Sequence, residues 1–194
     1  MNDQVQAELK KIFNGRFSTS ESTRANYARG EDTYDPVLSK AVVFPETNEE
    51  VSKILSLCNE HKIPVVPFGT GTSLEGNVVG NEKGITISLE KMNKVLSVNV
   101  EDFDCRVQAC VTKEQLNDYL REDGVFFPID PGANAAIGGM ASTSASGTMA
   151  VKYGTMKTVI TGLTVVLPSG EIVKTGSRTK KTSAGYNLTN LFIG

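Results

Sequence analysis

The spacing of apolar residues predicts a regular succession of strands and helices from residue 41 onward. Residues 42–44 form a short apolar run that is typical of a buried strand. Apolar side chains then recur between residues 51 and 58 at i, i+3, i+4 and i+7, which predicts an amphipathic helix. Residues 63–66 form the next apolar run. Because a helix joins the two strands, we expect a parallel β–α–β unit.

Two capping boxes mark the starts of the predicted helices. Thr47 and Thr112 stand three residues before Glu50 and Gln115. In such a box the threonine hydroxyl accepts the N3 backbone N–H, and the N3 side chain reaches back to the N-cap. We therefore expect helices to begin at both threonines.

The remaining pattern is rich in strands. Apolar runs predict extended segments over residues 85–88, 95–100, 106–109 and 125–127. The turn-forming tripeptide Pro168-Ser169-Gly170 separates two further runs, at 160–166 and 171–174, and predicts a hairpin. The fold class is therefore α+β.

The first part of the chain differs in character. Residues 1–34 are polar, with one helical pattern through Val5, Leu9, Ile12 and Phe13 and a second short helix within residues 18–29. We interpret residues 1–37 as a peripheral N-terminal helical arm and residues 38–194 as the domain proper.

Composition narrows the function classes. The hydrophobic fraction of 39% and the charged fraction of 22% are ordinary for a globular protein. The net charge is −2 and no predicted element concentrates basic residues, which argues against nucleic acid as a partner. No apolar stretch approaches a membrane span, and the polar start lacks a signal-peptide pattern, so we expect a cytoplasmic location.

The cysteine and histidine residues do not predict a disulfide or a metal site. Cys58, Cys105 and Cys110 are an odd number without CxxC spacing, and we expect buried reduced thiols. His61 is the only histidine in the sequence, so a zinc site is not expected.

A glycine- and hydroxyl-rich loop over residues 67–77 follows a predicted strand. Gly69 and Gly71 permit positive φ and let the backbone approach a ligand closely. Successive N–H groups in such a turn form a concave anion-binding nest. The loop lacks the Gly-Lys-Ser/Thr ending of a P-loop, and Leu74 stands where the Rossmann fingerprint needs glycine. Taken alone, the loop fits a pyrophosphate site and a plain connecting loop equally well.

A second segment, residues 130–147, consists mostly of tiny side chains and short hydroxyls. Such a run contributes little buried apolar area, so it fills a core poorly. It is suited to packing a flat ligand against the backbone. Two such segments, each expected to follow a strand, favour a ligand over a plain loop.

The order and spacing of PFGTGTSLEGN, DPGANAAIGGMASTSASG, VKYG and GYNLTNLFIG resemble the FAD-linked oxidases of the vanillyl-alcohol-oxidase type. The closest branch resembles D-lactate dehydrogenase and the glycolate oxidase flavoprotein subunit, over about residues 38–194. The resemblance implies the two-subdomain fold of p-cresol methylhydroxylase (PCMH), with a small parallel sheet, an antiparallel sheet and FAD between them. Lys152 and Thr158 depart from the Arg and Asn common in that branch.

The resemblance also implies the cofactor site. Residues 67–73 match the loop around the pyrophosphate, residues 130–136 match a second contact, and Gly138-Gly139 match a turn. Residues 143–146 match the stretch beside the ribityl chain and flavin ring. The residues expected to contact FAD are Pro67, Phe68, Gly69, Thr70, Gly71, Thr72, Ser73, Asp130, Pro131, Gly132, Ala133, Asn134, Ala135, Ala136, Gly138, Gly139, Thr143, Ser144, Ala145 and Ser146.

Family members continue beyond the segment that matches Gly194, with a substrate cap and the catalytic histidines. We therefore expect an incomplete C-terminus, no catalytic residue in this chain and no activity from it alone. An uncovered apolar face within residues 183–194 would favour self-association. Because the first loop lacks histidine, we expect non-covalent FAD.

The function predicted from the sequence is the FAD-binding part of a flavin-dependent dehydrogenase. Its substrate would be a 2-hydroxy acid of the D-lactate or glycolate type, oxidised by hydride transfer to flavin N5. An electron acceptor would be its other partner. Two alternatives stay open: another flavoenzyme of the superfamily, or a cofactor-free interaction or regulatory fragment. A peripheral position at the inner membrane face is compatible with the predicted cytoplasmic location.

Overall fold

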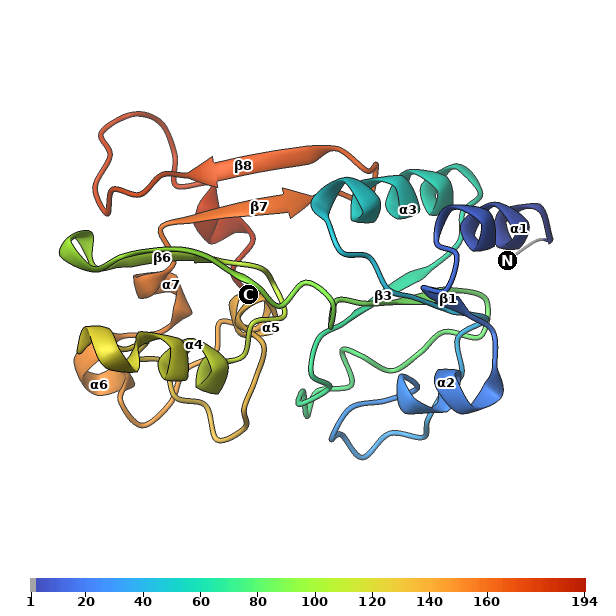
Figure 1. The fold of residues 1–194 in the computed structure, drawn as a ribbon, viewed down its shortest axis with the longest axis horizontal. Coiled ribbons are helices and arrows are strands. Elements are labelled where there is room, and N and C mark those ends of the chain that lie inside the picture. Colours follow the sequence, from blue (N-terminus) through green and yellow to red (C-terminus); the bar gives the residue numbers. More distant parts are fainter. Residues whose placement is uncertain (1–2) are drawn as a thin grey trace. The chain divides into compact units, whose positions relative to one another are not determined.

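The computed structural model describes residues 3–194, which fall into two compact units. Unit 1 comprises Met1–Met92 and Val166–Ile172, and unit 2 comprises Asn93–Val165 and Val173–Gly194. Figure 1 shows the order of the elements along the chain.

Helices and strands follow one another in groups rather than in strict alternation. The α-helices are α1 (Asp3–Ile12), α2 (Glu21–Asn26), α3 (Asn48–Glu60), α4 (Lys113–Leu120), α5 (Ile137–Ser142), α6 (Ala150–Tyr153) and α7 (Met156–Val159). The strands are β1 (Phe17–Ser18), β2 (Val42–Val43), β3 (Val65–Phe68), β4 (Ile85–Ser88), β5 (Val95–Asn99), β6 (Asp104–Val107), β7 (Gly162–Val166) and β8 (Ile172–Gly176). Short 3-10 turns lie at Val100–Asp102, Arg121–Asp123 and Thr189–Leu191.

Unit 1 is built on a sheet of order β1-β2-β4-β3. Strand β4 pairs in parallel with β2 and with β3, so the predicted parallel unit is confirmed with β4 inserted between its two strands. All four residues of β4 are buried, which is typical of a central parallel strand covered on both faces. Strand β1 adds an antiparallel edge through Phe17 and Val43.

Helix α3 begins at the predicted capping box. The Thr47 hydroxyl accepts the Glu50 N–H at 3.2 Å. The Glu50 carboxylate accepts the Glu46 N–H at 2.7 Å and binds both terminal nitrogens of Arg16 at 2.6 Å. These contacts, led by the Arg16 hydrogen bonds, lower the pKa of Glu50 to about 2. The cap of α3 is therefore tied to the N-terminal region by an ion pair.

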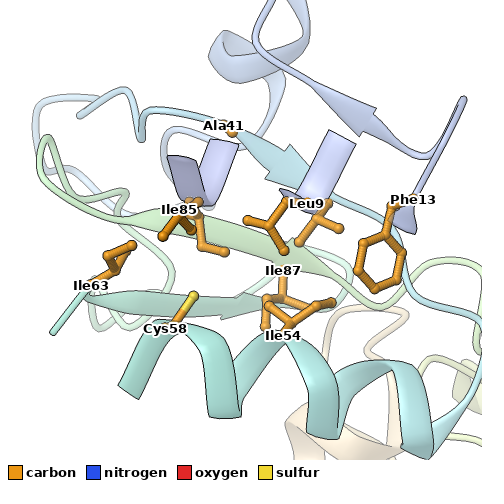
Figure 2. Packing of buried hydrophobic residues seen from close by; sticks show 10 residues of the cluster. Leu9, Phe13, Ala41, Ile54, Cys58, Ile63, Ile85 and Ile87 are labelled. Atoms are coloured by element: carbon orange, nitrogen blue, oxygen red, sulfur yellow. The ribbon is translucent and has the colours of Figure 1, made fainter. Parts of the chain in front are cut away.

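The interpretation of residues 1–37 as a peripheral arm is wrong for α1. Val5, Leu9 and Phe13 are fully buried and belong to the same apolar cluster as Ile54 and Ile87. Figure 2 shows Leu9 and Phe13 beside Ile54 and Ile87. The charged residues between these positions lie on the outer face of the helix, and the apolar stripe packs into the cluster although the segment as a whole is polar. The boundary at residue 38 stays a prediction.

Unit 2 contains an antiparallel hairpin, β5–β6, and a second apolar cluster. The hairpin turns through Phe103, which has a left-handed φ of 54°. Thr112 caps α4 by accepting the Gln115 N–H at 3.2 Å, which confirms the second predicted helix start. The cluster gathers residues of α4, α5, α7 and the C-terminal residues: Val111, Leu116, Leu120, Ile129, Ile137, Met140, Ala141, Met156 and Ile193.

The predicted hairpin of β7 and β8 is confirmed, and Figure 1 shows its strands running in opposite directions. Its turn belongs to unit 1, where the Ser52 hydroxyl donates to the Gly170 carbonyl and the Ser56 hydroxyl donates to the Ser169 carbonyl at 3.2 Å. The expected single antiparallel sheet is instead two separate two-stranded sheets, β5–β6 and β7–β8.

Three further expectations need correction. Residues 125–127 form no strand, so the second small-residue segment does not follow one. Strand β6 begins two residues earlier than predicted. Cys105 is exposed, whereas Cys58 and Cys110 are buried; burial raises the pKa of the Cys58 thiol to about 11.

Candidate functional site

The glycine-rich loop of unit 1 leaves the sheet at the carboxyl end of β3. Ligands of open parallel sheets bind outside this end of the strands. Phe68, the last residue of β3, is buried, and its carbonyl accepts the Leu89 N–H at 2.9 Å. Its ring packs edge-on against Tyr27, with centroids 5.1 Å apart. The buried Phe68 therefore fixes the start of the loop. Pro67, the residue before it, is exposed.

Gly71 gives the loop its shape. It has a φ of +74°, between Thr70 and Thr72 at negative φ, and a Cβ there would lie 2.8 Å from the Phe68 ring. Alternation of φ sign turns successive N–H groups toward one side. Within residues 3–194, the N–H groups of Gly71, Thr72 and Ser73 have no acceptor. Three successive donors are thus available to an anion.

Hydroxyl groups line the same turn. The oxygens of Thr70 and Thr72 lie 3.4 Å apart, and the Thr70 side chain is exposed. The Ser73 hydroxyl accepts the Glu75 N–H at 3.4 Å and so helps to shape the loop. The predicted residues from Gly69 onward therefore form one turn with polar groups at its surface.

Residues before the predicted domain also belong to this turn. The Glu31 N–H donates to the Gly71 carbonyl at 2.9 Å, and Gly30 packs directly on the backbone of the loop. Sequence reasoning missed these residues because they lie outside any helix or strand. Asp32, two residues after Gly30, is the available signal, because short acidic side chains commonly organise turns.

In unit 2, Asp130 anchors the start of the small-residue segment. Its carboxylate accepts the Thr148 hydroxyl at 2.6 Å and the Met149 N–H at 3.0 Å, and these bonds lower its pKa. A Cβ at Gly147 would overlap the Asp130 carbonyl and carboxylate. Asp130 thus joins the two ends of the segment by hydrogen bonds. It has this structural role whether or not it also contacts a cofactor.

The middle of the segment is fastened to the start of α4. The Asn134 side-chain oxygen accepts the Glu114 N–H at 3.1 Å, and the Ala135 carbonyl accepts the Lys113 N–H at 3.1 Å. Ala136 forms an isolated bridge with Thr112. The predicted Pro131, Gly132 and Ala133 precede this attachment, and Gly132 is exposed.

Gly138 and Gly139 do not form the expected turn, because they lie in the first turn of α5. A Cβ at Gly138 would meet Ala109 at 2.8 Å, and its N–H donates to the Ala109 carbonyl. Gly139 is exposed, and a Cβ there would meet nothing within 4 Å. The same holds at Gly132. The fold therefore requires glycine at 138 but leaves open space at 132 and 139.

Helix α5 ends in a Schellman motif at the predicted flavin-side residues. The Ala145 N–H donates to Met140 and the Ser144 N–H donates to Ala141, with Ser144 at a φ of +49°. The Thr143 hydroxyl donates to the Gly139 carbonyl at 3.1 Å. Ser146 follows in an exposed position. A serine where glycine is usual places a hydroxyl at a backbone conformation that carries strain.

The predicted site residues therefore form two local groups. Residues 67–73 form the loop of unit 1, and the residues from 130 to 146 form one closed segment of unit 2. Within each group the backbone is fixed by hydrogen bonds and close packing.

Comparisons with known proteins identify a family for the chain. The family described as FAD binding domain matches residues 39–176. A probable mitochondrial D-lactate dehydrogenase of Danio rerio is 48% identical over 91% of this chain and 36% of its own length. A mitochondrial D-lactate dehydrogenase [cytochrome] of Arabidopsis thaliana is 44% identical over 97% of this chain and 34% of its own length. The glycolate oxidase subunit GlcD of Bacillus subtilis is 34% identical over 92% and 38%.

Solved structures show the fold. An alkyldihydroxyacetonephosphate synthase has a TM-score of 0.87 at 22% identity, covering 100% of this chain and 38% of its own. A p-cresol methylhydroxylase has a TM-score of 0.76 at 23% identity, covering 100% and 41%. The predicted PCMH-type fold is therefore confirmed.

The chain spans about a third to two fifths of the length of these curated relatives. The family match covers most of the chain, including both candidate segments. The chain belongs to the FAD binding domain family that D-lactate dehydrogenases and glycolate oxidase subunits share.

Proposed function

We propose that this chain binds FAD non-covalently, with the loop over residues 67–73 at the pyrophosphate. The observation that carries the proposal is the run of three N–H groups at Gly71, Thr72 and Ser73 without an acceptor in the described chain. Backbone amides in such a nest bind phosphate oxygens without a metal ion. Residues 67–77 contain no basic side chain, so the loop would bind phosphate through its backbone amides and hydroxyls.

The unit 2 segment would hold the ribityl chain and flavin ring. The open positions at Gly132 and Gly139 support this assignment, because a flat ring can approach backbone that carries no side chain. The hydroxyls of Thr143, Ser144 and Ser146 offer hydrogen-bond partners to the ribityl group. When bound, FAD supplies the hydride-accepting chemistry at flavin N5.

The position of the histidine supports non-covalent attachment. His61 is the C-cap of α3, and its N–H donates to the Leu57 carbonyl at 3.2 Å. Residues 67–77 contain no histidine. Release of free FAD on denaturation with acid would test this assignment, whereas flavin retained on the precipitated chain would contradict it.

We propose oxidation of a 2-hydroxy acid, D-lactate or glycolate, as the activity of the whole protein. The names of the relatives support this substrate class, and the name of the Arabidopsis thaliana protein includes a cytochrome. In this proposal the present chain contributes cofactor binding and no general base. We expect the isolated chain to be inactive toward D-lactate.

Location and assembly are finer proposals. No helix within residues 3–194 has both the length and the apolarity that a membrane crossing requires. We propose a cytoplasmic location with peripheral membrane contact, although several relatives carry mitochondrial in their names.

Exposed Tyr186, Leu188 and Leu191 support self-association, whereas Ile193 is buried. Light scattering of the purified chain would show dimers, and a monodisperse monomer would contradict self-association.

Flavin binding is tested by absorbance and titration. The purified chain should carry oxidised-flavin absorbance, or should bind added FAD saturably with one cofactor per chain in calorimetry. A colourless chain that gives no heat with FAD and no thermal shift would contradict the proposal and favour a cofactor-free regulatory fragment.

A further inference from the structure

We infer that residues 28–37, which precede the part of the chain matched by the family, are positioning residues for the phosphate-binding loop. This inference rests on the proposed FAD binding and adds the residues that orient its donors. The segment contacts the loop at both ends, at Gly71 and at Gly76. It also lies within unit 1, as the loop does.

The decisive contact is a backbone hydrogen bond. The Glu31 N–H donates to the Gly71 carbonyl at 2.9 Å. In a trans peptide the carbonyl and the following N–H point to opposite sides, because the unit is planar. Holding the Gly71 carbonyl toward Glu31 therefore directs the Thr72 N–H away from Glu31. That N–H has no acceptor within residues 3–194.

The reverse orientation would harm anion binding. Without the Glu31 contact, the peptide between Gly71 and Thr72 can rotate through ψ of Gly71, because glycine has a wider range of allowed backbone conformations than other residues. A rotated peptide would present the carbonyl oxygen where the N–H had been. An oxygen dipole facing a pyrophosphate repels it, so one donor would be replaced by one repulsive group.

Close packing leaves the loop little freedom on this side. A Cβ at Gly30 would lie 2.5 Å from the Gly71 carbonyl oxygen and 3.0 Å from the Ser73 carbonyl oxygen. At the other end of the loop, a Cβ at Gly76 would lie 2.7 Å from the Tyr34 ring. The segment therefore packs against the loop at Gly71, Ser73 and Gly76.

Hydrogen bonds within the segment hold its own conformation. The buried Asp32 carboxylate accepts the Gly30 N–H and the Tyr34 N–H, both at 3.0 Å. The Ala28 carbonyl accepts the Val37 N–H at 3.3 Å and the Gly80 N–H at 2.9 Å. Because both carboxylate oxygens of Asp32 are used internally, this residue shapes the turn and does not face a ligand.

Gly30→Ala tests the inference in the 194-residue chain. The added methyl would push the Gly71 carbonyl away, and FAD affinity should fall roughly 10- to 100-fold, the effect of losing one hydrogen bond to a charged group. Amide exchange provides a second readout without cofactor: the Glu31 N–H should be protected in the wild type and should exchange faster in the variant.

Gly84→Ala is the matched control. A Cβ at Gly84 would overlap the Pro64 carbonyl, and neither Gly84 nor Gly30 has a positive φ. Gly84 precedes β4 at the end of the β3–β4 pair opposite to the loop. This variant should lose stability to a similar degree and bind FAD as the wild type does.

Asp32→Asn is the second variant in case Gly30→Ala fails to fold. It keeps one acceptor oxygen and the shape of the side chain, so its loss of FAD affinity should lie between those of the wild type and Asp32→Ala. Equal affinity of all three would contradict the inference.

The outcomes separate the inference from the proposed function. If Gly30→Ala binds FAD like the wild type while Gly71→Val does not, the positioning role is wrong and the phosphate site stands. Equal losses in Gly30→Ala and Gly84→Ala also overturn the positioning role, because the effect is then general destabilisation. A wild-type chain that binds no FAD overturns both.

Discussion

The two candidate segments use glycine for opposite reasons. In the loop of unit 1, Gly71 has positive φ and packs against the Phe68 ring, so the fold of the loop itself demands glycine. In unit 2, Gly132 and Gly139 have ordinary φ and open space where a Cβ would lie. Nothing within the described chain explains their small size. The fold of the loop therefore requires glycine at position 71, and in the proposed function the open positions of the segment leave room for the flavin.

The same contrast exists inside unit 2. Gly138 and Gly147 are packed against Ala109 and Asp130, whereas Gly132 and Gly139 are open. Substitutions at packed and at open positions should therefore separate stability from cofactor binding.

Gly147→Ala should have the largest effect on stability. The added Cβ would overlap the Asp130 carbonyl and carboxylate, and it would disturb the bonds to Thr148 and Met149. We expect a loss of about 3 kcal/mol in the free energy of unfolding, as for severe overpacking. Urea denaturation measures this loss. Gly132→Ala, with open space around it, should stay within about 0.5 kcal/mol of the wild type.

Gly71→Val should have the largest effect on cofactor binding. A β-branched residue at a φ of +74° is strained, and its side chain would meet the Phe68 ring. FAD affinity measured by calorimetry should fall by roughly 100-fold or more, with a loss of about 1–3 kcal/mol in stability. Gly15→Val is the control, because Gly15 has a φ of +75° and no neighbour within 4 Å. It should lose stability and keep FAD affinity; unchanged affinity in Gly71→Val would show that the loop is not the pyrophosphate site.

Glu50→Gln should reduce the stability of unit 1 without changing either segment. The pKa of Glu50 is lowered from 4.5 to about 2, mainly by its hydrogen bonds with Arg16. A lowered carboxylate pKa stabilises the fold above the unfolded pKa, and this contribution is lost as the pH falls from about 4.5 toward 2. At pH 7 the variant should lose on the order of 2 kcal/mol, with the partial exposure of the pair reducing the full linkage value. Thermal melts between pH 2 and pH 7 should show a flatter pH dependence in the variant; identical profiles would contradict the account.

Gly139→Ala should change stability and affinity in opposite directions. Alanine in an exposed helical position stabilises the helix by roughly 0.5–1 kcal/mol relative to glycine. The same methyl would obstruct a flavin ring at the open position, and FAD affinity should fall by roughly tenfold. Parallel thermal melts and FAD titrations would reveal the two signs. A variant that is more stable and binds FAD as well as the wild type would remove Gly139 from the site.

Local chemistry explains how much the sequence could predict. Thr47 and Thr112 are caps whose partners lie three residues away, so both helix starts could be read from the sequence. The apolar run at residues 63–66 and the alternating pattern at residues 85–88 predicted strands close to β3 and β4, because both patterns are typical of strands.

The errors arise where structure depends on distant contacts. Most side chains of helix α5 are small, and only Ile137, Met140 and Ala141 form its buried apolar side. Its sequence therefore resembles that of a loop. The core role of α1 depends on Leu9 meeting residues of α3 and β4 far along the chain. The Glu31 N–H donates to the Gly71 carbonyl about forty residues further along the chain, and no local pattern encodes such a contact.

The most direct test of the central claim is an NMR titration of the ¹⁵N-labelled chain with ADP and then with FAD. ADP carries the pyrophosphate without the flavin, so it should shift the amides of Gly71, Thr72 and Ser73 and leave those of Gly132 and Gly139 unchanged. FAD should shift both groups. Shifts by FAD that spare the loop over residues 67–73, or ADP shifts confined to unit 2, would contradict the assignment of one segment to the pyrophosphate and the other to the flavin.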